Sequence, residues 1–140
     1  MNFLSSLEIS SSGLSAQRKR MDVISSNLAN VETTHTEGGG PYKRKIVIMS
    51  ANPVGDFDQI LESQAEGVKI DDIVEDKSPY RKVFNPDHPD ADKDGYLLKP
   101  NVDLIVEITN MLLARRAFEA NATAIKSTKQ MALKALEIGR

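Results

Sequence analysis

The sequence predicts a mainly α-helical protein with a small β-rich middle, in which long N- and C-terminal helices pair as an antiparallel coiled coil and short strands lie between them. Three observations favour this fold class. The last forty residues carry a helical apolar stripe with no Pro or Gly before Gly139. Residues 3–31 carry a second helical pattern, and β-branched residues and turn signals are concentrated between the two. The expected segments are therefore 1–33, 34–100 and 101–140.

The N-terminal helix is expected over residues 3–31. Its apolar side chains recur one heptad apart, with Ile24 in a complementary position, and we assign them to helix packing: Leu7, Leu14, Met21 and Leu28. The Ser-rich run that ends at Gly13 is poor helix interior, because Gly alone costs up to about 1 kcal/mol there. We expect the first dozen residues to be helical only when they are packed against a partner.

The middle of the chain reads as loops and short strands. Residues 32–41 contain three consecutive glycines and Pro41, which predict a loop. Strands are expected over residues 42–49, 68–74 and 80–84, where β-branched and aromatic residues gather. Residues 51–67 are ambiguous, residues 85–95 are rich in turn formers, and residues 96–98 lead into the last helix.

The C-terminal helix is expected over residues 102–138, with Asn101 as its N-cap and Gly139 as its C-cap. One face is apolar: Leu104, Ile108, Met111, Phe118, Ala122, Ile125, Ala132 and Leu136. We assign Leu112, beside Met111, to the same packing surface. A second row is small or short and favours close approach of another helix: Ala114, Ala117, Asn121, Ala124, Thr128, Ala132 and Ala135.

The two helices differ in length. At 1.5 Å per residue the C-terminal helix would reach about 55 Å and the N-terminal helix about 40 Å. About 15 Å of apolar surface would then stay uncovered by the partner helix, which indicates contacts with other subunits.

Composition excludes several classes of function. A net charge of −2 and a pI near 5.7 do not match the basic footprint of a nucleic-acid binder. The chain has no cysteine, so it offers no disulfide, thiolate zinc site or cysteine nucleophile. No apolar stretch is long enough to span a bilayer, and no basic n-region with a cleavage site marks a signal peptide. We expect a soluble, unprocessed protein.

The strongest candidate for chemistry is an acidic loop. Asp90, Asp92, Asp94 and Gly95 have the spacing of the first half of an EF-hand loop, but Asn101 stands where the bidentate Glu is needed. We therefore favour a solvated acidic turn over a calcium site. The only histidines, His35 and His88, lie in loops without a ligand pattern. We predict no catalytic residue, no metal and no cofactor.

The two ends of the chain resemble the signatures of bacterial flagellar rod and hook proteins. The N-terminal match consists of SGLSAQ (12–17) and MDVISSNLAN (21–30), and the C-terminal match of NVDL (101–104), NM (110–111) and RAFEAN (116–121). The middle, with GGPYKRK (39–45), NPDHPDA (85–91) and GY (95–96), is similar to proximal rod subunits of that family. The residues that carry the signatures are Ser12, Gly13, Leu14, Asn27, Ala29, Asn30, Asn101, Val102, Arg116, Glu119 and Asn121.

The resemblance implies a structural subunit of the flagellar basal-body rod. Such a protein would be exported by the flagellar type III apparatus without a cleavable signal and would sit in the periplasmic part of the basal body. Its terminal helices would polymerise around the export channel and transmit torque, and its middle segment would make outer contacts. Its partners would be further copies of itself, other rod proteins and the adaptor that joins the rod to the membrane ring.

Two alternatives remain open from the residues. A soluble coiled-coil adaptor or export chaperone of the flagellar system would carry similar heptad seams. An enzyme could rest only on the acidic loop at residues 90–94.

Overall fold

The computed structural model describes residues 3–53 and 66–138, and its element order is helix, four strands, helix. Helix α1 (Phe3–Ala29) is followed by β1 (Lys45–Pro53), β2 (Glu66–Glu75), β3 (Arg81–Phe84) and β4 (Tyr96–Lys99), and the described chain ends with α3 (Leu104–Ile138). The predicted fold class is confirmed. The expected C-cap Gly139 and most of the ambiguous residues 51–67 lie outside the described residues.

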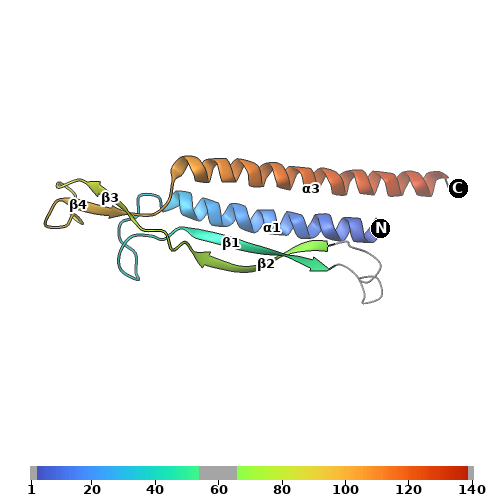
Figure 1. Ribbon diagram of the computed structural model, residues 1–140. Helices are drawn as coiled ribbons and strands as arrows, with labels where there is room; N and C mark the ends of the chain where they lie inside the picture. The colour runs from blue at the N-terminus through green and yellow to red at the C-terminus, as the bar shows by residue number, and fades with distance from the viewer. Residues whose placement is uncertain (1–2, 54–65, 139–140) are drawn as a thin grey trace.

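The two helices lie side by side and run in opposite directions, as Figure 1 shows. A two-stranded antiparallel ribbon, β1–β2, follows the other side of α1, so that α1 is the middle layer between α3 and the ribbon. The second antiparallel pair, β3–β4, projects beyond the C-terminal end of α1. With 35 residues against 27, α3 is about 12 Å longer than α1, close to the expected difference.

The first strand begins three residues later than predicted and continues to Pro53. Tyr42 and Arg44 do not join the ribbon because their backbone N–H groups have other acceptors: Thr33 O at 3.1 Å and Asn101 Oδ1 at 2.8 Å. A bulge in the β1–β2 register lies between Ile48 and Met49. Residues 96–99 also form a strand, where the sequence predicted only a connection, because they pair with β3.

The start of the C-terminal helix also differs from the prediction. Asp103, not Asn101, is the N-cap: its Oδ1 accepts hydrogen bonds from the N–H groups of Ile105 at 2.9 Å and Val106 at 3.1 Å. Asn101 is unavailable for capping because its side chain bonds to three backbone groups outside the helix. The helix therefore begins at Leu104, two residues after the expected start.

Few hydrophobic residues are buried for a chain of this size. The buried hydrophobic residues in the described part of the chain are Ala16, Val23, Ile24, Tyr42, Leu97, Val102 and Ala114. The accessible surface is 10037 Å², whereas a compact monomer of 15.4 kDa exposes about 7,200 Å². The extended shape thus leaves a large surface for neighbouring molecules.

Candidate functional site

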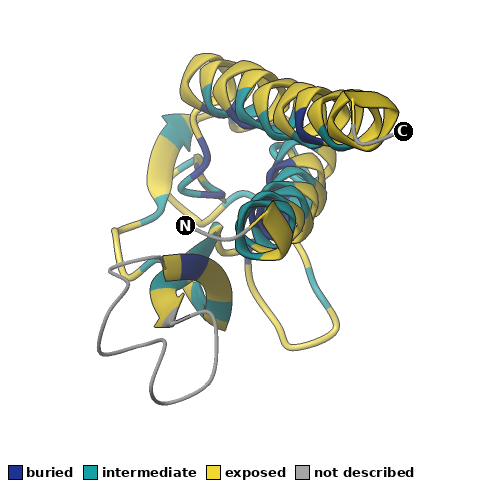
Figure 2. Cartoon of the chain, turned by 90° about the vertical axis from the view of Figure 1, so that its right-hand side faces the viewer, coloured by how far each residue is buried: buried dark blue, intermediate teal, exposed yellow. Residues whose placement is uncertain are grey.

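The most deeply buried side chains of helix α3 are not its large apolar ones. The buried residues of α3 are Glu107, Ala114 and Thr128, and Ala117 and Asn121 on the same face are half-buried. Glu107, Ala114, Asn121 and Thr128 are spaced one heptad apart, so they form one continuous row. In Figure 2 the buried and half-buried parts of α3 lie on the side toward α1, and its outer side is exposed. Most of the predicted small row therefore lies on the buried side of α3, but two of its members, Ala124 and Ala135, are exposed.

The two helices are in close contact at Gly13. A Cβ atom placed on Gly13 would lie 2.9 Å from Nδ2 of Asn121 and 3.2 Å from its Cγ. Asn121 is held in place by donating a hydrogen bond to Ala117 O at 3.1 Å. Gly13 lowers the stability of the helix itself, but only a residue without a side chain leaves room for Asn121 at this position.

Asn27 forms the centre of a buried polar junction between α1, β1 and α3. Its Nδ2 donates to Lys45 O at 2.9 Å and to Glu107 Oε2 at 3.0 Å. Its Oδ1 accepts from Lys45 N at 2.9 Å and from the Tyr42 hydroxyl at 3.0 Å. All four hydrogen-bonding positions of the amide are therefore used, although the residue is only 1% exposed.

Glu107 connects this amide to the rest of the junction. It is fully buried, and its Oε1 accepts from Arg44 Nη2 at 2.7 Å and Nε at 2.9 Å. Arg44 also donates to Asp76 Oδ2 at 3.2 Å. Burial lowers the pKa of Arg44, but the hydrogen bonds and charges of Glu107 and Asp76 outweigh burial and raise that pKa above its ordinary value.

Asn101 extends the junction to the loop after β2. Its Oδ1 accepts from Arg44 N, and its Nδ2 donates to Asp76 O at 3.2 Å and Ser78 O at 3.1 Å. The hydroxyl of Ser78, its N–H group and then Arg44 hold the pKa of Asp76 below its usual range. The junction therefore fixes the starts of β1 and α3 and the end of β2 relative to the C-terminal part of α1.

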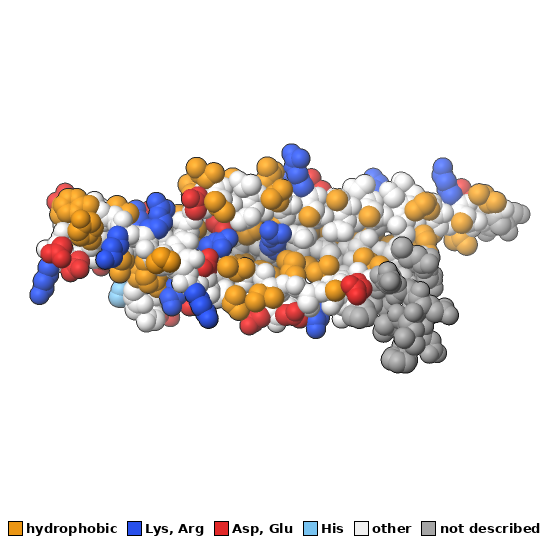
Figure 3. All heavy atoms as spheres, viewed as in Figure 1, with side chains coloured by type: hydrophobic (Ala, Val, Ile, Leu, Met, Phe, Trp, Pro, Cys, Tyr) orange, Lys and Arg blue, Asp and Glu red, His pale blue; other side chains and the backbone are white. Residues whose placement is uncertain are grey.

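The predicted packing residues divide between the helix contact and the outer surface. In α1, Ile24 is buried at 5% exposure, and the heptad row Leu7, Leu14, Met21 and Leu28 is half-buried. In α3, Met111, Phe118 and Ile125 are half-buried. Four predicted residues remain exposed: Leu104 (49%), Ile108 (53%), Leu112 (50%) and Leu136 (71%). Figure 3 shows apolar side chains along the outer side of α3 on the visible face.

The signature residues also occupy different environments. Asn27, Asn101 and Val102 belong to the junction or its buried base, with Val102 at 0% exposure. Gly13 and Asn121 form a close contact between the helices, and Ser12 Oγ accepts a hydrogen bond from Val68 N at 3.0 Å. Asn30 Nδ2 donates to Ser26 O at 2.8 Å near the end of α1. Leu14 is half-buried, while Ala29, Arg116 and Glu119 are exposed.

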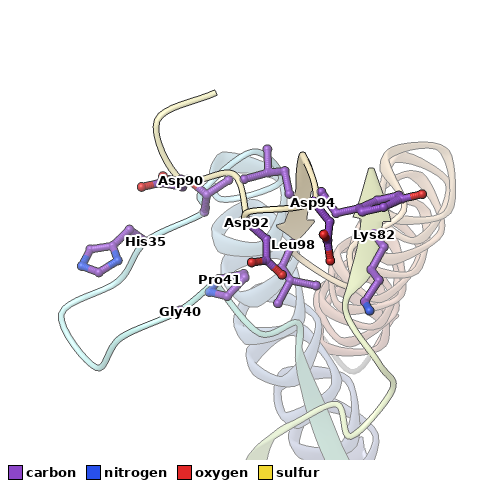
Figure 4. Close-up of a pocket in the computed structure, with 11 residues that line it drawn as sticks. His35, Gly40, Pro41, Lys82, Asp90, Asp92, Asp94 and Leu98 are labelled. Atoms are coloured by element: carbon purple, nitrogen blue, oxygen red, sulfur yellow. Dashed lines mark hydrogen bonds between the residues drawn. The ribbon is translucent and has the colours of Figure 1, made fainter. Parts of the chain in front are cut away.

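The acidic loop lines an open hollow of about 610 Å³ together with Tyr96 and Leu98. Its carboxylates do not converge, because Figure 4 shows Asp90 and His35 pointing away from Asp92 and Asp94. Asp90 Oδ2 instead accepts a hydrogen bond from Thr34 Oγ1 at 2.8 Å. Among the described residues, no group of three or more His, Asp or Glu side chains is placed to hold a metal ion.

Sequence reasoning missed the junction residues Tyr42, Arg44, Asp76 and Glu107. The available signal was Glu107, a carboxylate in heptad register with the small row at Ala114. A charge on a helix face that otherwise approaches a partner closely requires a buried counter-ion. The partner, Arg44, lies 63 residues away and could not be identified by spacing.

Neither helix in the described part of the chain has an apolar stretch sufficient to cross a membrane. Residues 7–34 match a family described as flagella basal body rod protein. Residues 93–138 match one described as flagellar basal body rod FlgEFG protein C-terminal. These two segments include α1 and α3 almost entirely.

Full-length relatives are similar to the whole chain, and each carries the name flagellar basal-body rod protein FlgC. The protein from Bacillus subtilis is 44% identical over 100% of both chains. The one from Borreliella burgdorferi is 44% identical over 99% of this chain and 98% of its own. The one from Salmonella typhimurium is 35% identical over 100% of both chains. This chain therefore belongs to the FlgC family of flagellar basal-body rod proteins.

Proposed function

We propose that the chain is a structural subunit of the flagellar basal-body rod and is built into the rod through the outer faces of its helix pair. The proposal rests on the difference in burial between two faces of α3. Ala114 and Thr128 are buried inside the subunit, whereas six large apolar side chains near the start of the helix are exposed: Leu104, Ile105, Val106, Ile108, Leu112 and Leu113. An exposed apolar surface of this kind indicates contacts with other chains.

The buried junction supports a mechanical role. Asn27, Arg44 and Glu107 connect α1, the start of β1 and α3 by hydrogen bonds that depend on geometry. A fully satisfied polar network fixes a single arrangement of the elements it joins. The junction thus holds the two helices at a defined register, and neighbouring subunits can then interlock on a rigid surface and transmit torque.

The partners and location follow from this role. We infer further copies of this chain, other rod proteins and the adaptor that joins the rod to the membrane ring as neighbours in the assembly. Residues 1–33 and 101–140 would form the axial helix layer, and residues 34–100 would make outer contacts. The subunit would reach the periplasmic part of the basal body through the flagellar type III export apparatus without a cleavable signal.

The role we propose requires no catalysis. The relatives are named as rod proteins, and the buried polar groups of the junction are satisfied by one another, so they do not present an activated group to a substrate. The same names disfavour the soluble adaptor or export chaperone as an alternative.

The test is incorporation of Leu112→Asp into the rod. Leu112 is half-exposed, so a charge there spoils an intersubunit contact without entering the core of the subunit. We expect normal expression but loss of the variant from purified basal bodies, and normal incorporation of the control Leu112→Met. Met111→Asp should also block incorporation, although its half-buried position makes it the less clean variant. Normal incorporation of Leu112→Asp would contradict the proposal, and recovery of the unaltered chain only from the cytosol would favour the adaptor.

A second measurement examines the isolated chain. The exposed apolar surface predicts that helicity measured by circular dichroism rises with protein concentration, because neighbours stabilise the helix ends. The peptide of residues 42–99, which lacks α1 and α3, serves as the control. Full helicity at all concentrations, with a cooperative melt, would show that the monomer satisfies its own helix faces.

A further inference from the structure

The β3–β4 end of the molecule presents an exposed aromatic surface. Phe84 and Tyr96 pair across the two strands in an edge-to-face arrangement with ring centroids 5.4 Å apart, and they are 64% and 48% exposed. Because side chains alternate along a strand, Leu97 is buried at 2% while Leu98 is 40% exposed on the same face as Tyr96. The outer face of this hairpin, formed by Lys82, Phe84, Tyr96 and Leu98, is therefore exposed and mainly apolar, with Lys82 opposite Leu98 as its one charged residue.

Carboxylates border this apolar face. Asp92 and Asp94 line the same hollow as Tyr96 and Leu98, and Figure 4 shows the two carboxylates on either side of Leu98 in that view. Lys82 and Asp90 line this hollow as well, so three carboxylates stand against one ammonium group. Residues 85–95 contain four Asp and one Lys, which gives the loop a net charge of −3. A ligand for this surface should combine apolar side chains with positive charge.

The far end of α3 has these properties. Lys126, Lys129, Leu133 and Leu136 recur at steps of three, four and three, so they share one helix face. All four are exposed, with Leu133 at 51% and Leu136 at 71%. Residues 122–138 contain three Lys and one Glu, a net charge of +2. We call this four-residue face the α3 tip face.

The two surfaces lie at opposite ends of the elongated subunit, as Figure 1 shows, so they cannot meet within one chain. We propose that the α3 tip face of one copy docks on the outer face of the β3–β4 hairpin of a second copy. The leucines would cover Phe84, Tyr96 and Leu98, and the lysines would lie against Asp92 and Asp94. Two different patches that meet in this way make a head-to-tail contact, which extends as an open assembly.

This inference rests on the proposed function, since it specifies one contact through which rod subunits would stack. Its test is a charge exchange in the full-length chain, followed by sedimentation velocity over a range of concentrations. One variant carries Asp92→Lys and Asp94→Lys, a second carries Lys126→Glu and Lys129→Glu, and a third combines all four. Asp71→Lys with Asp72→Lys makes the same charge change on exposed positions of β2 and serves as the matched control.

Like charges facing each other should weaken self-association of each of the first two variants by about tenfold or more. The combined variant should associate within about threefold of the unaltered chain, and so should an equimolar mixture of the first two variants, because opposite charges face each other again. The β2 control should associate normally. Circular dichroism at a dilution where the unaltered chain is also monomeric shows whether each variant has the same helicity as the unaltered monomer and is therefore equally folded.

A chain that stays monomeric at all concentrations overturns the inference, and so do two charge variants that associate normally or a combined variant that is not rescued. None of these outcomes bears on incorporation of Leu112→Asp in cells, so failure of this contact is distinguishable from failure of the proposed function.

Discussion

Glu107→Gln is the sharpest perturbation of the buried junction, because it changes one atom and the charge but not the size of the side chain. The carboxylate accepts two hydrogen bonds from Arg44 at Oε1 and one from Asn27 at Oε2, and it has no exposed surface. A glutamine has only one oxygen. If this oxygen faces Arg44, its NH₂ group meets the NH₂ group of Asn27, and two donors oppose each other.

The expected loss of stability is about 2 kcal/mol, the value for one buried hydrogen bond to a charged group. Two features keep the loss from being larger. Asn27 Nδ2 retains Lys45 O as an acceptor, and Arg44, whose side chain is 23% exposed, retains Asp76 at 3.2 Å and contact with solvent. For a chain of this length, 2 kcal/mol corresponds to a fall in Tm of about 6–10 °C.

Glu119→Gln is the matched control. Glu119 lies on the same helix and also accepts from an arginine, Arg115 Nε at 3.0 Å, but both side chains are exposed, at 59% and 71%. Its loss should cost less than about 0.5 kcal/mol. Urea unfolding followed by far-UV circular dichroism measures both variants, with equal m-values showing that the free energies are comparable. Equal destabilisation by the two substitutions would refute the importance of the buried junction.

Gly13→Ala should destabilise the subunit by about 1 kcal/mol, since the clash with Asn121 outweighs the gain in helix propensity. In an Asn121→Ala background the same substitution should be stabilising. A double-mutant cycle measured by urea unfolding tests this, and additive effects of the two substitutions would contradict it. Asp76 has a pKa below its ordinary value of 3.8, so its contribution to stability is complete above that pH and is lost as the pH falls. Asp76→Asn should therefore make the decline in unfolding free energy below about pH 4 shallower, and an unchanged acid slope would argue against this. Asp103→Ala should lower the free energy of unfolding by about 1 kcal/mol, because it removes the N-cap of α3. Urea unfolding measures this loss, and an unchanged free energy would favour Asn101 as the N-cap.

The sequence by itself determined that two long helices enclose a middle segment of short strands. Local periodicity predicted α1 and α3 to within about two residues at the ends that the structure describes, because a helix repeats its pattern over many turns. The strands were predicted less well. Lys45 rather than Tyr42 begins β1, and β4 was not foreseen as a strand, because four residues such as Tyr96–Lys99 become a strand only by pairing with another segment.

Only the tertiary structure decided which face of α3 lies against α1 and which stays exposed. Periodicity marks a face but does not identify its partner, and α3 carries both the small row at Ala114 and an apolar stripe at Leu112. The structure buries Ala114 and Thr128 of the small row, on the side where Gly13 leaves room for Asn121, and leaves Leu112 exposed. The burial of Glu107 likewise depends on residues far away in the sequence. Arg44 and Asn27 satisfy its carboxylate, and only the folded chain brings them within hydrogen-bonding reach.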